Sequence, residues 1–181
     1  MRMEPIERPR SLVMRIGYWM ARRQLGAVPA AFKVFYARKP KLALLAQRIL
    51  RTQERLSLDR GLVHLLMVQT SRVNGCGFCA DLHLAQLVRE KLGTDKFEAL
   101  ADYRSSSAFS ERERSALAFS EEATRDREVS DATYAELAKH FSDEEIVEIV
   151  WVNAIGNYFN LIAVPLGFES EGLAELARRA A

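Results

Sequence analysis

The feature that most restricts the fold is a run of apolar side chains from residue 62 to 68, interrupted only by His64. It lies in a segment that is predicted to be helical from Leu58 to about Arg72, with Ser57 placed to cap its start. A helix that is apolar nearly all round has no face to turn toward water, so other elements must surround it. The sequence therefore predicts a central buried helix with the rest of the chain packed around it.

The other segments also have helical patterns, and none shows the sustained period-two alternation with turn dipeptides that is typical of strands. Ser110 and Ser130 are placed to cap helices, and Ser142 with Glu145 forms the capping-box pattern that opens a long apolar helix. The predicted helices lie at about 10–25, 28–37, 41–55, 58–72, 76–92, 111–125, 131–140, 143–161 and 171–179. We therefore expect an all-α fold, a single-domain helical bundle.

Composition narrows the class of protein further. The chain has 181 residues, 49% hydrophobic and 28% charged, which is typical of one globular domain. Its net charge is +2 with no block of like charges, so nucleic acid is not an expected partner. No stretch approaches about 18 uncharged apolar residues, and three arginines interrupt the apolar pattern near the N-terminus. We expect a soluble, cytoplasmic protein with no membrane partner.

Residues 1–26 are basic and amphipathic, and docking of their apolar stripe on the domain or on a neighbouring subunit is a simpler interpretation than binding to a membrane surface.

The glycines never form a G-x-G-x-x-G or P-loop pattern, so the sequence implies no organic cofactor.

The two cysteines, Cys76 and Cys79, lie at the predicted start of a helix that follows a break at Asn74-Gly75. Their spacing lets the two sulfurs approach within disulfide geometry, while unpaired N–H groups and the helix dipole stabilise a thiolate. His83 lies four residues after Cys79, so its imidazole is on the same helix face, where it can accept or return a proton. The pattern C-x-x-C-x-x-x-H thus unites a nucleophile, a resolving thiol and an acid-base group.

The stretch from 71 to 83, SRVNGCGFCADLH, resembles the signature of the alkylhydroperoxidase D-like branch of the carboxymuconolactone decarboxylase family. The similarity continues in residues 141–149 and includes Asn157 and Asn160, and it extends over about 35–168. The resemblance implies an all-helical fold that assembles into a symmetric homo-oligomer, a dimer, trimer or hexamer. We expect residues 35–181 to form this domain and residues 1–34 to be an N-terminal helical extension of unknown role.

The resemblance also implies a peroxidase-type reaction on a small hydroperoxide. Cys79 would attack the peroxide and become a sulfenic acid, and Cys76 would condense with it to a disulfide. An external dithiol or thiol reductant would restore both thiols, and His83 would belong to the proton relay. The family pattern places a Glu twelve residues before the first cysteine, where this chain has His64. A histidine there can still pass protons, and as a cation it would stabilise the thiolate.

Other interpretations stay open at this point. The chain can be a redox-sensing or stress-linked binding protein, in which the disulfide changes assembly without turnover. His64, Cys76, Cys79 and His83 are four potential zinc ligands if the helix before the cysteines folds back on the next one. His64 on an apolar helix is also typical of a buried core histidine. Lactone decarboxylation is disfavoured, because the enzymes named for that reaction typically lack the C-x-x-C pair.

Overall fold

The computed structural model describes residues 1–92 and 94–180, and every regular secondary-structure element within these is a helix. Their bounds are α1 (Leu12–Leu25), the π-helix η1 (Phe32–Tyr36), α2 (Pro40–Gln53), α3 (Arg60–Val73), α4 (Gly77–Glu90), α5 (Asp95–Glu98), the 3-10 helix η2 (Ala99–Asp102), α6 (Glu111–Asp126), α7 (Asp131–Ala138), α8 (Asp143–Ala163) and α9 (Leu173–Ala180). The predicted all-α, single-domain fold is confirmed.

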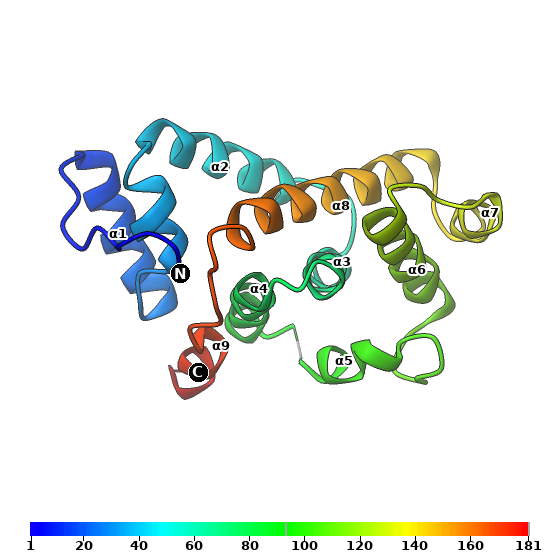
Figure 1. Cartoon of the computed structure of the whole chain (residues 1–181). Helices are drawn as coiled ribbons and strands as arrows, with labels where there is room; N and C mark the ends of the chain where they lie inside the picture. Colours follow the sequence, from blue (N-terminus) through cyan, green and yellow to red (C-terminus); the bar gives the residue numbers. More distant parts are fainter. Residues whose placement is uncertain (93, 181) are drawn as a thin grey trace.

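Helix α3 is the centre of the molecule, as its apolar sequence predicts. Nine of its fourteen residues are buried, and it packs against α4, α6 and α8. In Figure 1, α3 and α4 are seen nearly along their axes below the long helix α8, and α6 lies on the other side of α3 from α4. The main core gathers side chains from α3, η2, α6, α7 and α8, and includes Leu66, Leu117 and Ile149. Helix α3 therefore links this core to the cysteine helix α4.

The start of α3 differs from the prediction, because Asp59 and not Ser57 is its cap. The Asp59 carboxylate accepts a hydrogen bond from the Leu62 N–H at 3.0 Å. Ser57 instead donates from its N–H and from its hydroxyl to Glu148 of α8, at 2.9 and 3.0 Å. Both residues are good caps by type. A carboxylate from a distant helix decides between them, and no local sequence pattern contains that information.

Other boundaries also differ from the expectation. The segment 28–37 forms only the short π-helix η1, in which the Ala37 N–H donates to the Phe32 carbonyl at 2.9 Å. A hydrogen bond that spans five residues widens the turn relative to an α-helix. Helix α4 ends at Glu90, followed by Lys91 with a left-handed φ of 56°. The predicted stop at Gly93 lies outside the described residues, and α5 and η2 are not indicated by the sequence pattern.

Helix α8 begins with the predicted capping box, in which Ser142 and Glu145 each accept a hydrogen bond from the other's N–H. Midway along it, the buried Asn153 amide donates to the hydroxyls of Ser120 and Thr124 on α6, at 2.9 and 2.8 Å. Among the described helices, α8 alone is long and apolar enough to cross a membrane, yet 44% of its apolar window is buried inside the protein. Its packing against α3 and α6 is that of a core helix.

The N-terminal segment and the C-terminal helix α9 lie on the same side of the molecule, to the left of α3 in Figure 1. The Arg2 N–H donates to the Leu166 carbonyl at 2.9 Å, and the Ile6 N–H donates to the Lys33 carbonyl at 3.0 Å. Helix α9 packs along α4, and α1 contacts α9. The N-terminal region is therefore joined to the C-terminal segment as well as to its own neighbours in sequence.

Candidate functional site

The turn before the cysteines is held by side chains of α8. Gly75, in the break that the sequence predicts, has a φ of +67°, a left-handed conformation that favours glycine. The Asn74 amide donates to the amide oxygens of Asn157 and Asn160, at 2.9 Å each. Asn160 in turn donates to the Ser71 hydroxyl at 3.2 Å. These hydrogen bonds fix the chain reversal that sets α3 beside α4.

Cys76 and Cys79 form a disulfide at the start of α4. Cys76 caps this helix, since its sulfur accepts a hydrogen bond from the Cys79 N–H at 3.3 Å. The first-turn N–H groups and the positive end of the helix dipole favour negative charge here, so the same geometry favours a thiolate after reduction. Only 2% of Cys76 and 5% of Cys79 are exposed. The sulfur pair therefore lies inside the protein.

The cover over the disulfide comes from both ends of the chain. We call the side chains that pack with the cysteines the thiol cover: Met3, Ala30, Ala31, Val34, Phe35, Ala163, Leu166 and Phe168. Phe168 also packs edge-on against Phe78 of α4, with ring centroids 5.5 Å apart. Residues 1–34, whose role the sequence does not indicate, thus supply part of the surroundings of the cysteines.

A carboxylate on the cysteine helix, Asp81, ties the C-terminal helix α9 to α4. It accepts hydrogen bonds from the Ser170 hydroxyl and from the N–H groups of Glu171, Leu173 and Ala174, at 2.9 to 3.1 Å. A carboxylate at a helix start satisfies N–H groups that have no partner within the helix, and it complements the helix dipole. No local sequence pattern indicates this contact, which holds one side of the site together.

His83 on α4 and His64 on α3 lie side by side, with ring centroids 5.8 Å apart. Each is only 8% exposed, and the Nδ1 atom of each has no hydrogen-bond partner among the described residues. Burial, together with the neighbouring His64, lowers the pKa of His83 to about 3. A neutral imidazole with a free ring nitrogen can accept a proton. The reversal of the chain therefore brings the two histidines into one candidate acid-base pair.

Two charged residues beside this pair, Glu90 and Arg60, are absent from the sequence-based site. Glu90 is the last residue of α4, and its Oε2 lies 3.7 Å from Nε2 of His64. Arg60, the first residue of α3, donates to the two carboxylate oxygens of Glu90 at 2.7 and 2.9 Å. Burial lowers the pKa of His64, the Glu90 carboxylate raises it and the Arg60 charge lowers it. Only the α3–α4 packing reveals this contact, because no local spacing in the sequence pairs these positions.

A metal site has no support in this geometry. Within residues 1–92 and 94–180, no group of three or more His, Cys, Asp or Glu side chains is arranged to hold a metal ion. The disulfide also occupies both sulfurs that the zinc interpretation needs.

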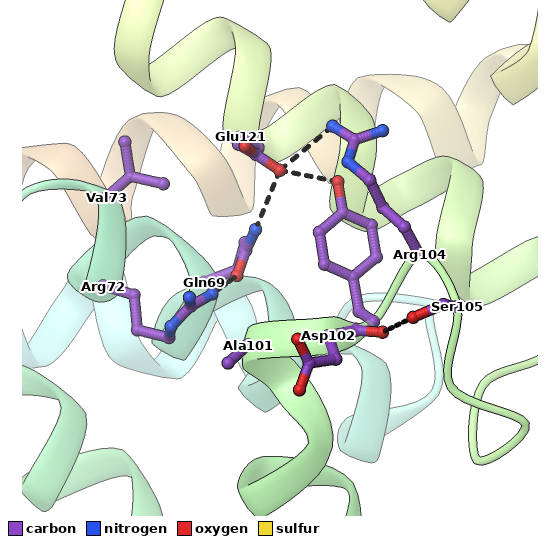
Figure 2. Close-up of a pocket in the computed structure, with 9 residues that line it drawn as sticks. Gln69, Arg72, Val73, Ala101, Asp102, Arg104, Ser105 and Glu121 are labelled. Atoms are coloured by element: carbon purple, nitrogen blue, oxygen red, sulfur yellow. Dashed lines mark hydrogen bonds and ion pairs between the residues drawn. The ribbon is translucent and has the colours of Figure 1, made fainter.

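A polar cavity of about 320 Å³ lies between α3, η2 and α6 (Figure 2). Its lining residues are Gln69, Arg72, Val73, Ala101, Asp102, Tyr103, Arg104, Ser105 and Glu121. Glu121 accepts hydrogen bonds from the Tyr103 hydroxyl at 2.6 Å and from Arg104 at 3.1 Å, so its charge is matched by its own neighbours. No candidate catalytic residue lines this cavity, which is therefore separate from the cysteine site.

The fold and the site define a class of protein, an all-helical domain with a C-x-x-C disulfide at a helix start and a buried histidine one turn beyond. The sequence model of the carboxymuconolactone decarboxylase family matches residues 43–122, which contain all of these residues. The match covers 80 of the 181 residues, and together with a structural relative that is 27% identical it supports the similarity of the chain to this family and to its alkylhydroperoxidase D-like branch. The resemblance predicted from the sequence is confirmed.

Individual relatives cover most of the chain. The uncharacterized protein YnjA of Escherichia coli is 26% identical over 171 residues, 93% of each chain. A protein of unknown function from Agrobacterium tumefaciens, suggested to be the antioxidant defence protein AhpD, is 27% identical. Its structure covers 76% of this chain and 95% of its own, with a TM-score of 0.71. The debrominase Bmp8 is 20% identical and covers 97% of this chain and 95% of its own, with a TM-score of 0.82, and it shows the shared fold alone.

Proposed function

We propose that the chain is a thiol-dependent hydroperoxide reductase in which Cys79 attacks the peroxide and Cys76 resolves the oxidised product. The observation that supports this proposal is the Cys76–Cys79 pair at the start of α4, one turn before the buried His83. The match to the family model, and similarity to a protein suggested to be AhpD, agree with it.

The proposed chemistry has three steps. The Cys79 thiol passes its proton to the histidine pair, and the thiolate attacks one peroxide oxygen, so that the O–O bond breaks. Cys79 becomes a sulfenic acid, while the leaving alkoxide takes the proton and becomes an alcohol. The Cys76 thiol then condenses with the sulfenic acid, which releases water and forms the disulfide. An external dithiol exchanges with this disulfide, restores both thiols and is itself oxidised.

The partners are part of the same proposal. A small hydroperoxide would be the substrate, and a dithiol or thiol of the cytoplasm would be the reductant. His64 and His83 would form the acid-base pair, with His64 at the position where the family pattern has a carboxylate.

The test is steady-state reduction of hydrogen peroxide and of an organic hydroperoxide by the reduced protein with a dithiol donor. We expect Cys79→Ser to lose all turnover, because the nucleophile is gone. Cys76→Ser should lose turnover but still consume one equivalent of peroxide, leaving a sulfenic acid that mass spectrometry detects with a sulfenic-acid reagent. Full turnover by Cys79→Ser would exclude the mechanism.

A second candidate is a redox sensor, and the burial of both cysteines under the thiol cover favours it. Breaking or forming the disulfide changes the groups that pack against both ends of the chain. A sensor would change its elution from a sizing column between the reduced and oxidised forms, while peroxide turnover stayed at background. Turnover well above background with no change in assembly would favour the enzyme.

A further inference from the structure

A single face of the α3–α4 pair carries a series of groups that can exchange protons. Cys79, His83 and Glu90 follow one another on α4 at intervals of four and seven residues, which are one and two turns of the helix. His64 projects from α3 beside His83 and contacts Glu90. The series therefore runs from the buried disulfide to a carboxylate that is 32% exposed.

We propose that Glu90 is a positioning residue of this site, which orients His64 and stabilises the imidazolium that forms when His64 takes up a proton. The inference rests on the proposed function, in which the Cys79 proton moves to the histidine pair and returns to the leaving alkoxide. A carboxylate 3.7 Å from the imidazole favours its charged form, and the attraction is stronger away from bulk water.

Arg60 gives the Glu90 carboxylate a defined direction. It binds both oxygens through two nitrogens, a geometry that fixes the plane of the carboxylate more firmly than a single contact. The side chain of Arg60 is 53% exposed, and an ion pair so close to solvent contributes little to the free energy of unfolding. The pair has a clearer consequence at the site, since it holds one oxygen of Glu90 toward His64.

The charged and titratable groups around His64 have opposite effects on its pKa, and variants of single groups can separate these effects. His83 faces it from α4, Glu90 faces it from the end of α4, and Arg60 precedes it by one turn on α3. Glu54, which follows α2, acts on Arg60. Removing Glu90 or removing Arg60 breaks the same ion pair, but the first loss disfavours the imidazolium and the second favours it.

The first measurement is an NMR titration of the histidines in the reduced protein, which has only three of them. His64→Gln assigns the His64 signal. We expect Glu90→Gln to lower the pKa of His64 and Arg60→Gln to raise it, with Glu90→Asp closer to the wild type. A purely structural ion pair would give changes of the same kind in Glu90→Gln and Arg60→Gln. Equal His64 pKa values in the wild type and Glu90→Gln would overturn the inference, whether or not the protein turns over.

The second measurement is peroxide turnover with a dithiol donor. Glu90→Gln should lower kcat about tenfold, the effect of one pKa unit on a proton-transfer equilibrium, with KM within about twofold because Glu90 does not touch the substrate. Glu90→Asp should recover part of the loss. Glu136→Gln is the matched control, since Glu136 lies on α7, which packs on α6 and α8, and its carboxylate is 3.4 Å from Nε2 of His140; it should keep the wild-type kcat.

Failure of the proposed function and failure of the proposed role of Glu90 give different results. A wild type without turnover on either hydroperoxide would contradict the proposed function, and the titration would still decide the coupling between Glu90 and His64. A wild type that turns over, with an unchanged kcat in Glu90→Gln, would contradict the role of Glu90 and leave the proposed function standing.

Discussion

In the folded protein His83 meets no group that favours its charged form strongly enough to offset burial. Burial and the neighbouring His64 lower its pKa to about 3, whereas an unfolded chain protonates a histidine near pH 6.5. Between these values the unfolded state binds one more proton than the folded state. The free energy of unfolding therefore falls as the pH falls below about 6.5, and this loss continues until the pH approaches 3.

This linkage predicts that lowering the pH from 7 to 5 costs about 2 kcal/mol of stability through His83 alone. His64, whose pKa burial also lowers, adds to the loss with the same sign. Urea unfolding of the oxidised protein at each pH measures the effect. His83→Asn should flatten the dependence, while His140→Gln, at a partly exposed site, should leave it steep. An equally steep dependence in His83→Asn would contradict the assignment.

Some residues of the candidate site can be predicted from local spacing in the sequence, and others only from the packing of distant segments. Cys76, Cys79 and His83 lie within two turns of one helix, so their spacing alone predicts that they share a face. Glu90 also lies on that helix, but its relevance depends on the α3–α4 packing that brings His64 to it. The structure joins Cys76 to Cys79 and sets His64 beside His83, and the catalytic roles of these four residues stay predictions.

The contacts of Asp81 predict how strongly helix α9 is attached to α4. Its carboxylate serves four donors at the start of α9, two of them N–H groups of the first turn. We expect Asp81→Ala to remove about 2 kcal/mol from this attachment, so α9 amides should exchange with deuterium roughly thirtyfold faster.

The control for this prediction is Glu175→Ala, because Glu175 lies on α9 itself and pairs with Arg179 at an exposed position. It should leave exchange of α9 close to the wild type. Hydrogen exchange of α3 should be unchanged in both variants, since α3 lies in the main core. Protection of α9 that is equal in Asp81→Ala and the wild type would show that apolar packing alone holds the helix.

The elements themselves were predictable wherever their signals are local. The Ser110 cap of α6, the capping box of α8 and the apolar sequence of α3 were predicted correctly, because each depends on residues a few positions apart. The cap of α3 and the short η1 were not predictable. Glu148 of α8 accepts the hydrogen bonds of Ser57, and a π-turn carries no distinct sequence pattern. Sequence periodicity also says little about which helix ends meet.

For the whole molecule, two exposed apolar faces predict where copies of the chain meet. On the outer face of α1, Leu12, Ile16 and Trp19 are 67%, 51% and 60% exposed, and on α8 Val147 and Leu161 are 67% and 61% exposed. Exposed apolar surface on a helix is typical of interaction sites, and most oligomers of soluble proteins are symmetric. We propose that these faces contribute to the homo-oligomer that the family resemblance implies.

Light scattering coupled to a sizing column tests this proposal. Trp19→Glu and Leu161→Glu, made separately, should shift the wild type toward smaller species, because a charge at an apolar contact is costly to bury. Lys41→Glu, at an exposed position of α2, should not change the mass. A wild type that is monomeric at its highest attainable concentration would contradict the proposal.

The thiol cover consists of parts that the ribosome makes at different times. Met3 and Val34 precede the cysteines, whereas Leu166 and Phe168 are added long after Cys79. At roughly 5–20 residues per second, the thiols of a growing chain emerge some seconds before the later half of their cover exists. During that interval, cellular oxidants and thiols reach both sulfurs without entering a folded protein. The redox state of the pair at the end of translation is therefore set by the compartment in which the chain is made, before the native site has formed.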